Sequence, residues 1–246
     1  MARASRRKLS KKYRRKRKRH TRRAAPGKRI QYGSGASIPK LCIQTAKEAI
    51  PSYITEQLNQ YLKGWTYTFF TDAEILAFFA ANPSKAHPNI AEVFQNLSLG
   101  EHKADLFRYY YLFLKGGVYI DADLMLYEQL DVILGDKAFV SVRAIKPPGS
   151  IFNGFLAAIP NHPIIKEALD AMYKSNPAEL AKNYNAMVSK LGSIVEAHLD
   201  TSVKLLKEIT NTDYSCHIED PDTGKVPMIH YQNVDIPNLP IHSPQP

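Results

Sequence analysis

Two aspartates, Asp121 and Asp123, stand one residue apart directly after the short apolar run 118–120. If that run is a strand and continues, both carboxylates point to the same side of it. Two carboxylates that face one cleft repel each other unless a cation lies between them or one is protonated. Mg²⁺ and Mn²⁺ prefer oxygen ligands, and Mg²⁺ keeps positions for water and phosphate. The pair is therefore a sensible anchor for a metal–diphosphate, although two aspartates at a strand–loop junction more often cap a turn.

A carboxylate and a guanidinium precede this aspartate pair. Asp105 and Arg108 are three residues apart in a helix predicted over residues 101–115, so they share one helical face. Gly116-Gly117 stops that helix and leads straight into the apolar run. The glycines therefore hold helix and strand together and bring the charged side chains close. The alternative for Asp105 and Arg108 is an exposed ion pair, worth only about 0.3–0.5 kcal/mol.

The elements that position these residues alternate between strand and helix. Residues 38–45 are an apolar run that predicts a buried strand, and residues 51–64 predict a helix. Residues 65–70 alternate like a strand, and the capping box from Thr71 to Glu74 begins another helix. Further strands are expected over residues 118–120, 138–143 and 151–157, and further helices over residues 162–174 and 178–198. This order predicts a parallel α/β sheet, whose ligands bind beyond the carboxyl ends of its strands.

The run from Ala104 to Asp123 resembles the sugar-transferase family with a DXD motif, glycosyltransferase family 32. The family signature reads approximately A-D-x-x-R-Y-x-x-L-x-x-x-G-G-x-Y-x-D-x-D, and this chain fills each of its fixed positions. Supporting matches are Ile38-Pro39-Lys40, Gln44-Thr45, Trp65, Asn153-Gly154-Phe155 and His162-Pro163. The chain departs from the family pattern at Ile43 and Ala46, where His and Trp are usual.

The resemblance implies a GT-A fold, an α/β Rossmann-like mixed sheet flanked by helices, over residues 38–236. It implies that Asp123 ligates Mn²⁺ or Mg²⁺ directly and that Asp121 contacts the metal through water, or the ribose. Asp105 would hydrogen-bond sugar hydroxyls, and Arg108 would approach the sugar or diphosphate. The donor would be a UDP-hexose or GDP-hexose. Relatives of this type retain the anomeric configuration, so no dedicated base is required.

Five further residues belong to the expected site. Tyr119 matches a signature position, Gln44 and Thr45 match the family in the opening strand, and the resemblance assigns all three to donor binding. Asn153 matches an asparagine near the acceptor side of similar enzymes, although an Asn before Gly also forms turns. His230 lies in an apolar C-terminal run where related transferases place a late metal ligand, and a hydrogen-bonded, partly buried histidine is the alternative.

The charge of the chain is concentrated at its N-terminus. Residues 1–29 hold 16 of the 33 Lys and Arg and no Asp or Glu, whereas the remainder has 17 basic and 23 acidic side chains. We expect residues 1–29 to be a disordered basic arm, residues 30–37 a flexible linker and residues 237–246 a proline-rich tail. An arm of this charge attracts nucleic acid, an anionic membrane face or an import receptor, or is simply solvated.

Three functions remain open at this point. The first is a metal-dependent, retaining transferase that moves a hexose to a glycan, lipid or protein hydroxyl. The second is a nucleic-acid- or virion-associated binding protein with an inactive transferase body, and the third is a cytosolic enzyme that glycosylates a host protein. The sequence contains neither an apolar run long enough to span a bilayer nor a secretory signal, so we expect a cytoplasmic protein, or a nuclear or virion-associated one, that is not secreted. Cys42 and Cys216 are expected to be buried free thiols.

Overall fold

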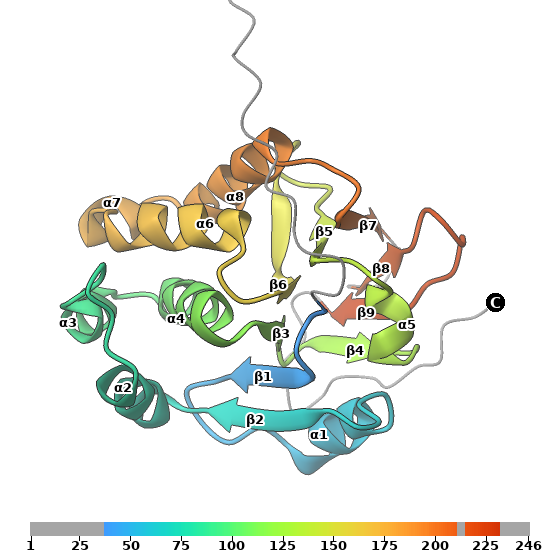
Figure 1. The fold of residues 1–246 in the computed structure, drawn as a ribbon, viewed down its shortest axis with the longest axis horizontal. Helices are drawn as coiled ribbons and strands as arrows, with labels where there is room; N and C mark the ends of the chain where they lie inside the picture. The colour runs from blue at the N-terminus through green and yellow to red at the C-terminus, as the bar shows by residue number, and fades with distance from the viewer. Residues whose placement is uncertain (1–36, 211–214, 232–246) are drawn as a thin grey trace, which may run out of the picture. The chain divides into compact units, whose positions relative to one another are not determined.

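The computed structural model describes residues 37–210 and 215–231, which form one mixed sheet with helices packed against it (Figure 1). The strands are β1 (Leu41–Thr45), β2 (Thr66–Phe70), β3 (Gly117–Ile120), β4 (Leu124–Leu126), β5 (Phe139–Arg143), β6 (Ile151–Ala158), β7 (Val203–Thr210), β8 (Ser215–Glu219) and β9 (Met228–Tyr231). The helices are α1 (Ser52–Asn59), α2 (Asp72–Ala81), α3 (Ile90–Asn96), α4 (Gly100–Lys115), α5 (Leu130–Leu134), α6 (Pro163–Tyr173), α7 (Pro177–Leu180) and α8 (Ala186–Ala197). The predicted arm, linker and tail lie outside these residues, apart from Ser37.

The sheet is mixed, with strand order β2-β1-β3-β6-β5-β7-β8-β9-β4. β1 runs parallel to β2 and β3, and β5 runs parallel to β7, whereas the other neighbours are antiparallel. The expectation of a parallel sheet is therefore wrong, because β5 and β6 are joined by a short connection, which suits antiparallel strands. The α/β mixed sheet flanked by helices is confirmed.

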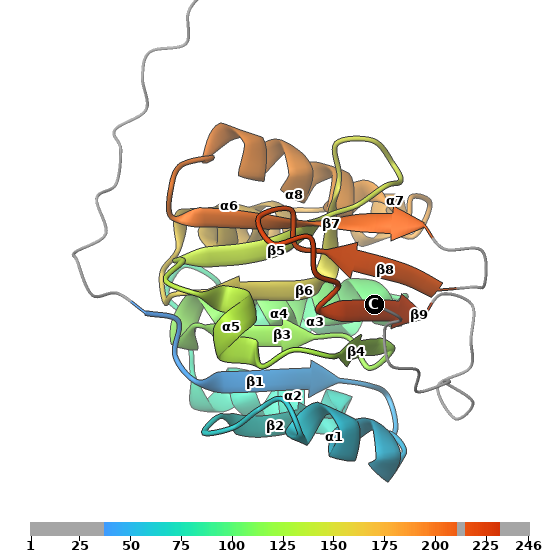
Figure 2. The same cartoon turned by 90° about the vertical axis from the view of Figure 1, so that its right-hand side faces the viewer.

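β3 and β4 follow each other in the chain but are not neighbours in the curled sheet. β4 follows β3 after only three residues, yet it pairs with β9 at the far edge, with Leu124 opposite His230. Residues 121–123 therefore join a central strand to the last strand of the sheet. Figure 2 shows β3, β4 and β9 close together on the side that faces the viewer. The curl thus brings the C-terminal strand to the end of β3.

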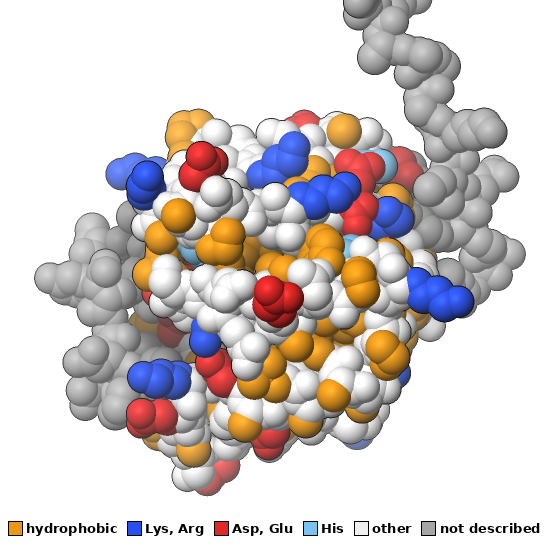
Figure 3. Space-filling view, turned by 90° about the vertical axis from the view of Figure 1, so that its left-hand side faces the viewer, with side chains coloured by type: hydrophobic (Ala, Val, Ile, Leu, Met, Phe, Trp, Pro, Cys, Tyr) orange, Lys and Arg blue, Asp and Glu red, His pale blue; other side chains and the backbone are white. Residues whose placement is uncertain are grey.

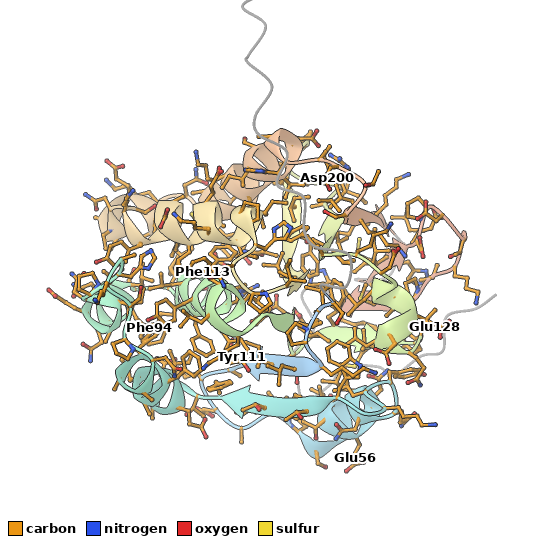
Figure 4. All side chains as sticks on the ribbon, in the orientation of Figure 1. Glu56, Phe94, Tyr111, Phe113, Glu128 and Asp200 are labelled. Atoms are coloured by element: carbon orange, nitrogen blue, oxygen red, sulfur yellow. The ribbon has the colours of Figure 1, made fainter. Side chains whose placement is uncertain are left out.

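A layer of helices covers one face of the sheet. α2, α3, α4, α6 and α8 enclose the main core, in which Phe94 and Tyr111 are buried and Phe113 packs at the edge (Figure 4). Viewed from outside, hydrophobic side chains gather across the middle of this layer, and most charged side chains lie above and below them (Figure 3). α1 packs against β4 in a smaller core that contains Ile54 and Met125.

The junction between α4 and β3 depends on two glycines. Gly116 ends α4 with φ +67°, and Gly117 begins β3 with φ +103°. A Cβ on Gly117 would lie 2.4 Å from the carbonyl oxygen of Leu41, so β3 approaches β1 closely only with glycine there. The prediction that these glycines couple the helix to the strand is confirmed, as is the capping box of Thr71 and Glu74 at the start of α2.

Several elements differ from the sequence-based expectation. The helix predicted over residues 178–198 is two helices, α7 and α8, separated by residues 181–185. α3, β4, α5, β7 and β8 were not predicted. Strand β7 carries Lys204, Lys207 and Glu208, which weaken the apolar pattern that reveals a strand. Cys42 and Cys216 are buried free thiols, as expected. In the described parts of the chain, no helix is long and apolar enough to cross a membrane.

Candidate active site

A cavity of about 740 Å³ lies where β1 and β3 end and α4 begins. β1 points to the right in Figure 2 and β3 runs parallel to it, so the cavity lies beyond that end of both strands. Its volume is within the usual range for small-molecule sites, roughly 300–1,000 Å³. The expected residues that line it are Thr45, Asp105, Arg108, Tyr119, Asp121, Asp123 and Asn153. The structure therefore brings seven of the nine predicted site residues to one cavity.

Arg108 is the buried cation of the site. Its Nη2 atom lies 3.4 Å from Asp121 Oδ1, and its Nε atom lies 3.5 Å from Asp105 Oδ1. The Nη1 atom donates a 2.5 Å hydrogen bond to the carbonyl oxygen of Asn153. The guanidinium also lies 4.0 Å from the centre of the Tyr119 ring. The Asp105–Arg108 pair is thus buried, which excludes the exposed ion pair considered from sequence.

Asp105 lines the cavity, but little of its side chain is exposed to solvent. Its side chain is 7% exposed, and its Oδ1 atom accepts a 2.5 Å hydrogen bond from Asn153 Nδ2. Burial raises the pKa of Asp105 to about 7, with Arg108 opposing the change and Asp121 adding to it. Asn153 therefore contacts both members of the pair, by its backbone to Arg108 and by its side chain to Asp105.

The Tyr119 hydroxyl holds the Asp121 carboxylate in place. Tyr119 donates a 2.6 Å hydrogen bond to Asp121 Oδ1, and the same hydroxyl lies 3.0 Å from Thr45 Oγ1. The other oxygen, Oδ2, would lie 2.5 Å from a Cβ on Gly154, so the absence of a side chain there makes room for the carboxylate. One Asp121 oxygen is therefore bound by the protein, and the side chain remains 29% exposed toward the cavity.

Asp123 is the more open carboxylate, and a C-terminal histidine lies beside it. β3 ends at Ile120, and residues 121–124 form a turn closed by a 3.1 Å hydrogen bond from Leu124 N to Asp121 O. The strand thus does not continue through the two aspartates, yet both carboxylates reach the cavity. His230 Nε2 lies 3.6 Å from Asp123 Oδ2, and His230 Nδ1 lies 3.5 Å from Glu208 Oε1.

The charge of His230 follows from these two contacts. Burial lowers the pKa of His230, but the carboxylates of Asp123 and Glu208 outweigh it and raise the pKa to about 9. The imidazole is therefore protonated at neutral pH and pairs with both carboxylates. Coordination of a metal by His230 would require loss of that proton. The ring also packs on Phe152, with the ring centres 4.4 Å apart.

The donor atoms at this position fit a divalent cation. Within residues 37–210 and 215–231, no three His, Cys, Asp or Glu side chains lie together in a way that could hold a metal ion by themselves. However, Asp123 Oδ1 is buried and has no hydrogen-bond partner among the described residues, so this carboxylate oxygen is available to bind a cation. Two carboxylates beside a roomy cavity match the way Mg²⁺ is held, with one or two protein oxygens and the other positions taken by water and phosphate.

Two predicted residues lie outside the cavity lining. Gln44 is 1% exposed and links elements behind the wall, donating to Asp121 O at 3.3 Å and accepting from the Tyr67 hydroxyl at 2.8 Å. His230 reaches the site through Asp123. The sequence does not indicate Glu208, because the charged side chains of β7 hide its strand pattern, and it does not indicate Tyr184, because the pattern of residues 178–198 predicts one helix. Asn183 and Asn185, which flank Tyr184, are turn-forming residues that signal this break.

The buried acid makes stability depend on pH. Asp105 has a pKa near 3.8 when unfolded and about 7 when folded, so the folded state binds its proton more tightly. Protonation of Asp105 makes its whole contribution to the free energy of unfolding below pH 4. This contribution is lost as pH rises to 7, by up to about 1.4 kcal/mol per pH unit. Asp105→Asn keeps the shape and the acceptor for Asn153 but removes the titration. Urea unfolding from pH 4.5 to 7.5 should show a steeper decline for the wild type than for this variant, and parallel curves would contradict it.

Fold and site together define the class of protein. A buried arginine and two carboxylates meet at the carboxyl ends of parallel strands, next to a cavity, as expected for an α/β protein that binds a metal–diphosphate ligand. Residues 40–140 match the model of a family described as glycosyltransferase sugar-binding region containing DXD motif. The predicted resemblance to DXD-motif sugar transferases is therefore confirmed over residues 40–140.

Individual relatives agree with this assignment. Inositol phosphoceramide mannosyltransferase 1 of Schizosaccharomyces pombe is 30% identical over 151 residues, which cover 58% of this chain and 46% of the relative. A mannosyl phosphorylinositol ceramide synthase of Saccharomyces cerevisiae is 32% identical over 139 residues, which cover 55% of this chain and 35% of the relative. An uncharacterized glycosyltransferase of Acanthamoeba polyphaga mimivirus is 28% identical over 55% of each chain. The chain thus spans about half, or less, of the length of these relatives.

Among solved structures, the PaToxG glycosyltransferase is similar with a TM-score of 0.47 and 17% identity, over 66% of this chain and 70% of that one.

Proposed function

We propose that the chain is a metal-dependent transferase that moves a hexose from a nucleotide sugar to an acceptor hydroxyl. The observation that carries the proposal is the Asp121/Asp123 pair at the end of β3, open to a cavity and backed by the buried Arg108. This pair lies within the matched region of residues 40–140. Asp121, Asp123 and, after loss of its proton, His230 would hold Mn²⁺ or Mg²⁺. The metal would supply Lewis-acid stabilisation of the departing diphosphate.

The names of the relatives favour mannose as the hexose. Two of them are named for mannosyl transfer to an inositol phosphoceramide. The donor would then be GDP-mannose, with a UDP-hexose as the competing donor. The acceptor would be a hydroxyl on a lipid headgroup, and hydroxyls of glycans or proteins are the competing acceptors.

The protein groups would orient the donor in this reaction. Asp105 and Asn153, already hydrogen-bonded to each other, would face the sugar hydroxyls, and Arg108 with Tyr119 would keep Asp121 in place. The acceptor oxygen forms a bond to the anomeric carbon, the bond from that carbon to the diphosphate breaks, and the acceptor proton leaves with a diphosphate oxygen. Retention of anomeric configuration would follow if the acceptor enters on the side that the diphosphate leaves.

Stabilisation of the full-length chain by donors tests the proposal. We expect GDP-mannose to raise the melting temperature only when Mn²⁺ is present, by an amount equivalent to about 2.7 kcal/mol at 100 times the Kd. The shift should vanish in the Asp121→Ala/Asp123→Ala variant. If neither GDP-mannose nor any UDP-hexose gives a metal-dependent shift, the proposal is wrong. A shift with UDP-hexoses alone would keep the activity but replace mannose.

A further inference from the structure

The cavity has a second wall that comes from outside the matched region. Apart from His230 on β9, the residues assigned to the metal and diphosphate lie on β1, α4 and the end of β3, within residues 40–140. The lining also includes Tyr184, from the segment between α7 and α8, and Val188, in the first turn of α8. This wall is therefore built by a part of the chain that the family model does not describe.

Tyr184 is an aromatic side chain left open on that wall. In the described part of the chain, three large hydrophobic side chains are strongly exposed, namely Val132, Leu199 and Tyr184. Tyr184 is 63% exposed, the highest of the three, and it alone among them lines the cavity. An aromatic ring has a flat face of substantial apolar area that is suited to stacking. Its position indicates contact with a ligand rather than with the core.

The hydroxyl of Tyr184 lies within electrostatic reach of the donor-side carboxylates. Partial burial and the carboxylates of Glu101, Asp121, Asp105 and Asp123 raise the pKa of its phenol. The phenol shares the lining of the cavity with these carboxylates, and it stays uncharged at neutral pH. Glu101, in the first turn of α4, is exposed and lines the same cavity, which gives this region a hydrogen-bond acceptor.

We propose that Tyr184 and Glu101 form the acceptor subsite and bind a polyol ring. The C–H face of the ring would stack on the phenol, and its hydroxyls would donate to the Glu101 carboxylate. A terminal hexose of a glycan and the cyclitol of a lipid headgroup share this chemistry. The subsite rests on the proposed function, because the opposite wall must hold the donor. It places the acceptor hydroxyl next to the anomeric carbon, where the bond transfer described above occurs.

The test separates acceptor recognition from donor binding. We would measure the Kd of GDP-mannose with Mn²⁺, and the KM of two acceptors, myo-inositol 1-phosphate and methyl α-mannoside. In Tyr184→Ala we expect the acceptor KM to rise at least about fivefold more than the donor Kd, as expected for loss of a stacking contact. Tyr184→Phe keeps the ring and should stay close to the wild type. Leu199→Ala, an exposed apolar residue away from the cavity lining, is the matched control and should change neither value.

The outcomes are distinct. Preference for the inositol phosphate would identify a lipid headgroup as the source of the ring, and preference for the mannoside would identify a glycan. An unchanged acceptor KM in Tyr184→Ala, or an equal loss of donor affinity, would overturn the subsite. A wild type that hydrolyses the donor but neither binds nor uses either polyol would overturn the ligand class. Failure of the wild type to bind any donor would instead reject the proposed function, and the subsite with it.

Discussion

Replacement of Asp123 by alanine is expected to abolish metal-dependent donor binding while the fold survives. Asp123 contributes the buried, unpartnered oxygen of the site, and its side chain is 34% exposed toward the cavity. Loss of a direct ligand should exceed the roughly 10- to 100-fold loss in affinity that follows removal of a group behind the ligands. Titration of Mn²⁺ followed by electron paramagnetic resonance, with and without GDP, measures this loss independently of turnover.

A matched control uses another aspartate. Asp136 is 91% exposed and pairs only loosely with its neighbour Lys137, at 3.3 Å. Asp136→Ala removes the same charge from the surface and should leave both Mn²⁺ binding and the melting temperature unchanged. Equal Mn²⁺ affinity in the Asp123 and Asp136 variants would exclude Asp123 as a ligand.

Replacement of Arg108 by methionine should cause the largest loss of stability. Arg108 is 3% exposed and lies between Asp105 and Asp121, so its removal leaves two carboxylates without their buried cation. Breaking a buried ion pair by removing one partner costs about 3–5 kcal/mol. Urea unfolding at pH 7.5 measures the change in the free energy of unfolding. The loss should shrink at pH 5, where Asp105 is protonated in the folded protein.

A second arginine provides the comparison. Arg143 pairs with Glu196 at 2.6 Å, but both side chains are about half exposed. Because water screens such pairs, Arg143→Met should cost only about 0–1 kcal/mol. Similar losses in the two variants would show that burial of Arg108 does not control its contribution.

Sequence alone was sufficient for the parts of the site that depend on neighbouring residues. The periodicity of α4, the two glycines and the apolar run of β3 lie within one continuous stretch, so they place Asp105, Arg108 and Asp121 together without knowledge of the rest of the fold. The capping box of α2 is equally local. Such signals act over a few residues, which is why they could be predicted.

The other residues of the candidate site are placed by contacts between distant parts of the chain. Glu208 meets His230 because β7, β8 and β9 are adjacent, and their register is set by packing rather than by any one strand. Tyr184 reaches the cavity because the chain turns between α7 and α8. No pattern within either segment indicates where the partner lies, so neither residue could be assigned to the site beforehand.

The pairing of β9 with β4 affects the order in which the site can form during translation. Residues 124–126 have their sheet partner in residues 228–230, and Tyr231 N donates a 3.0 Å hydrogen bond to Asp123 O. During translation, the DXD turn therefore emerges long before the strand that anchors it, and closure of so long a loop is slow. A nascent chain stalled before residue 228 should bind metal poorly, although both aspartates are present. Tight capture of Mn²⁺ would then report that the last strand has been added.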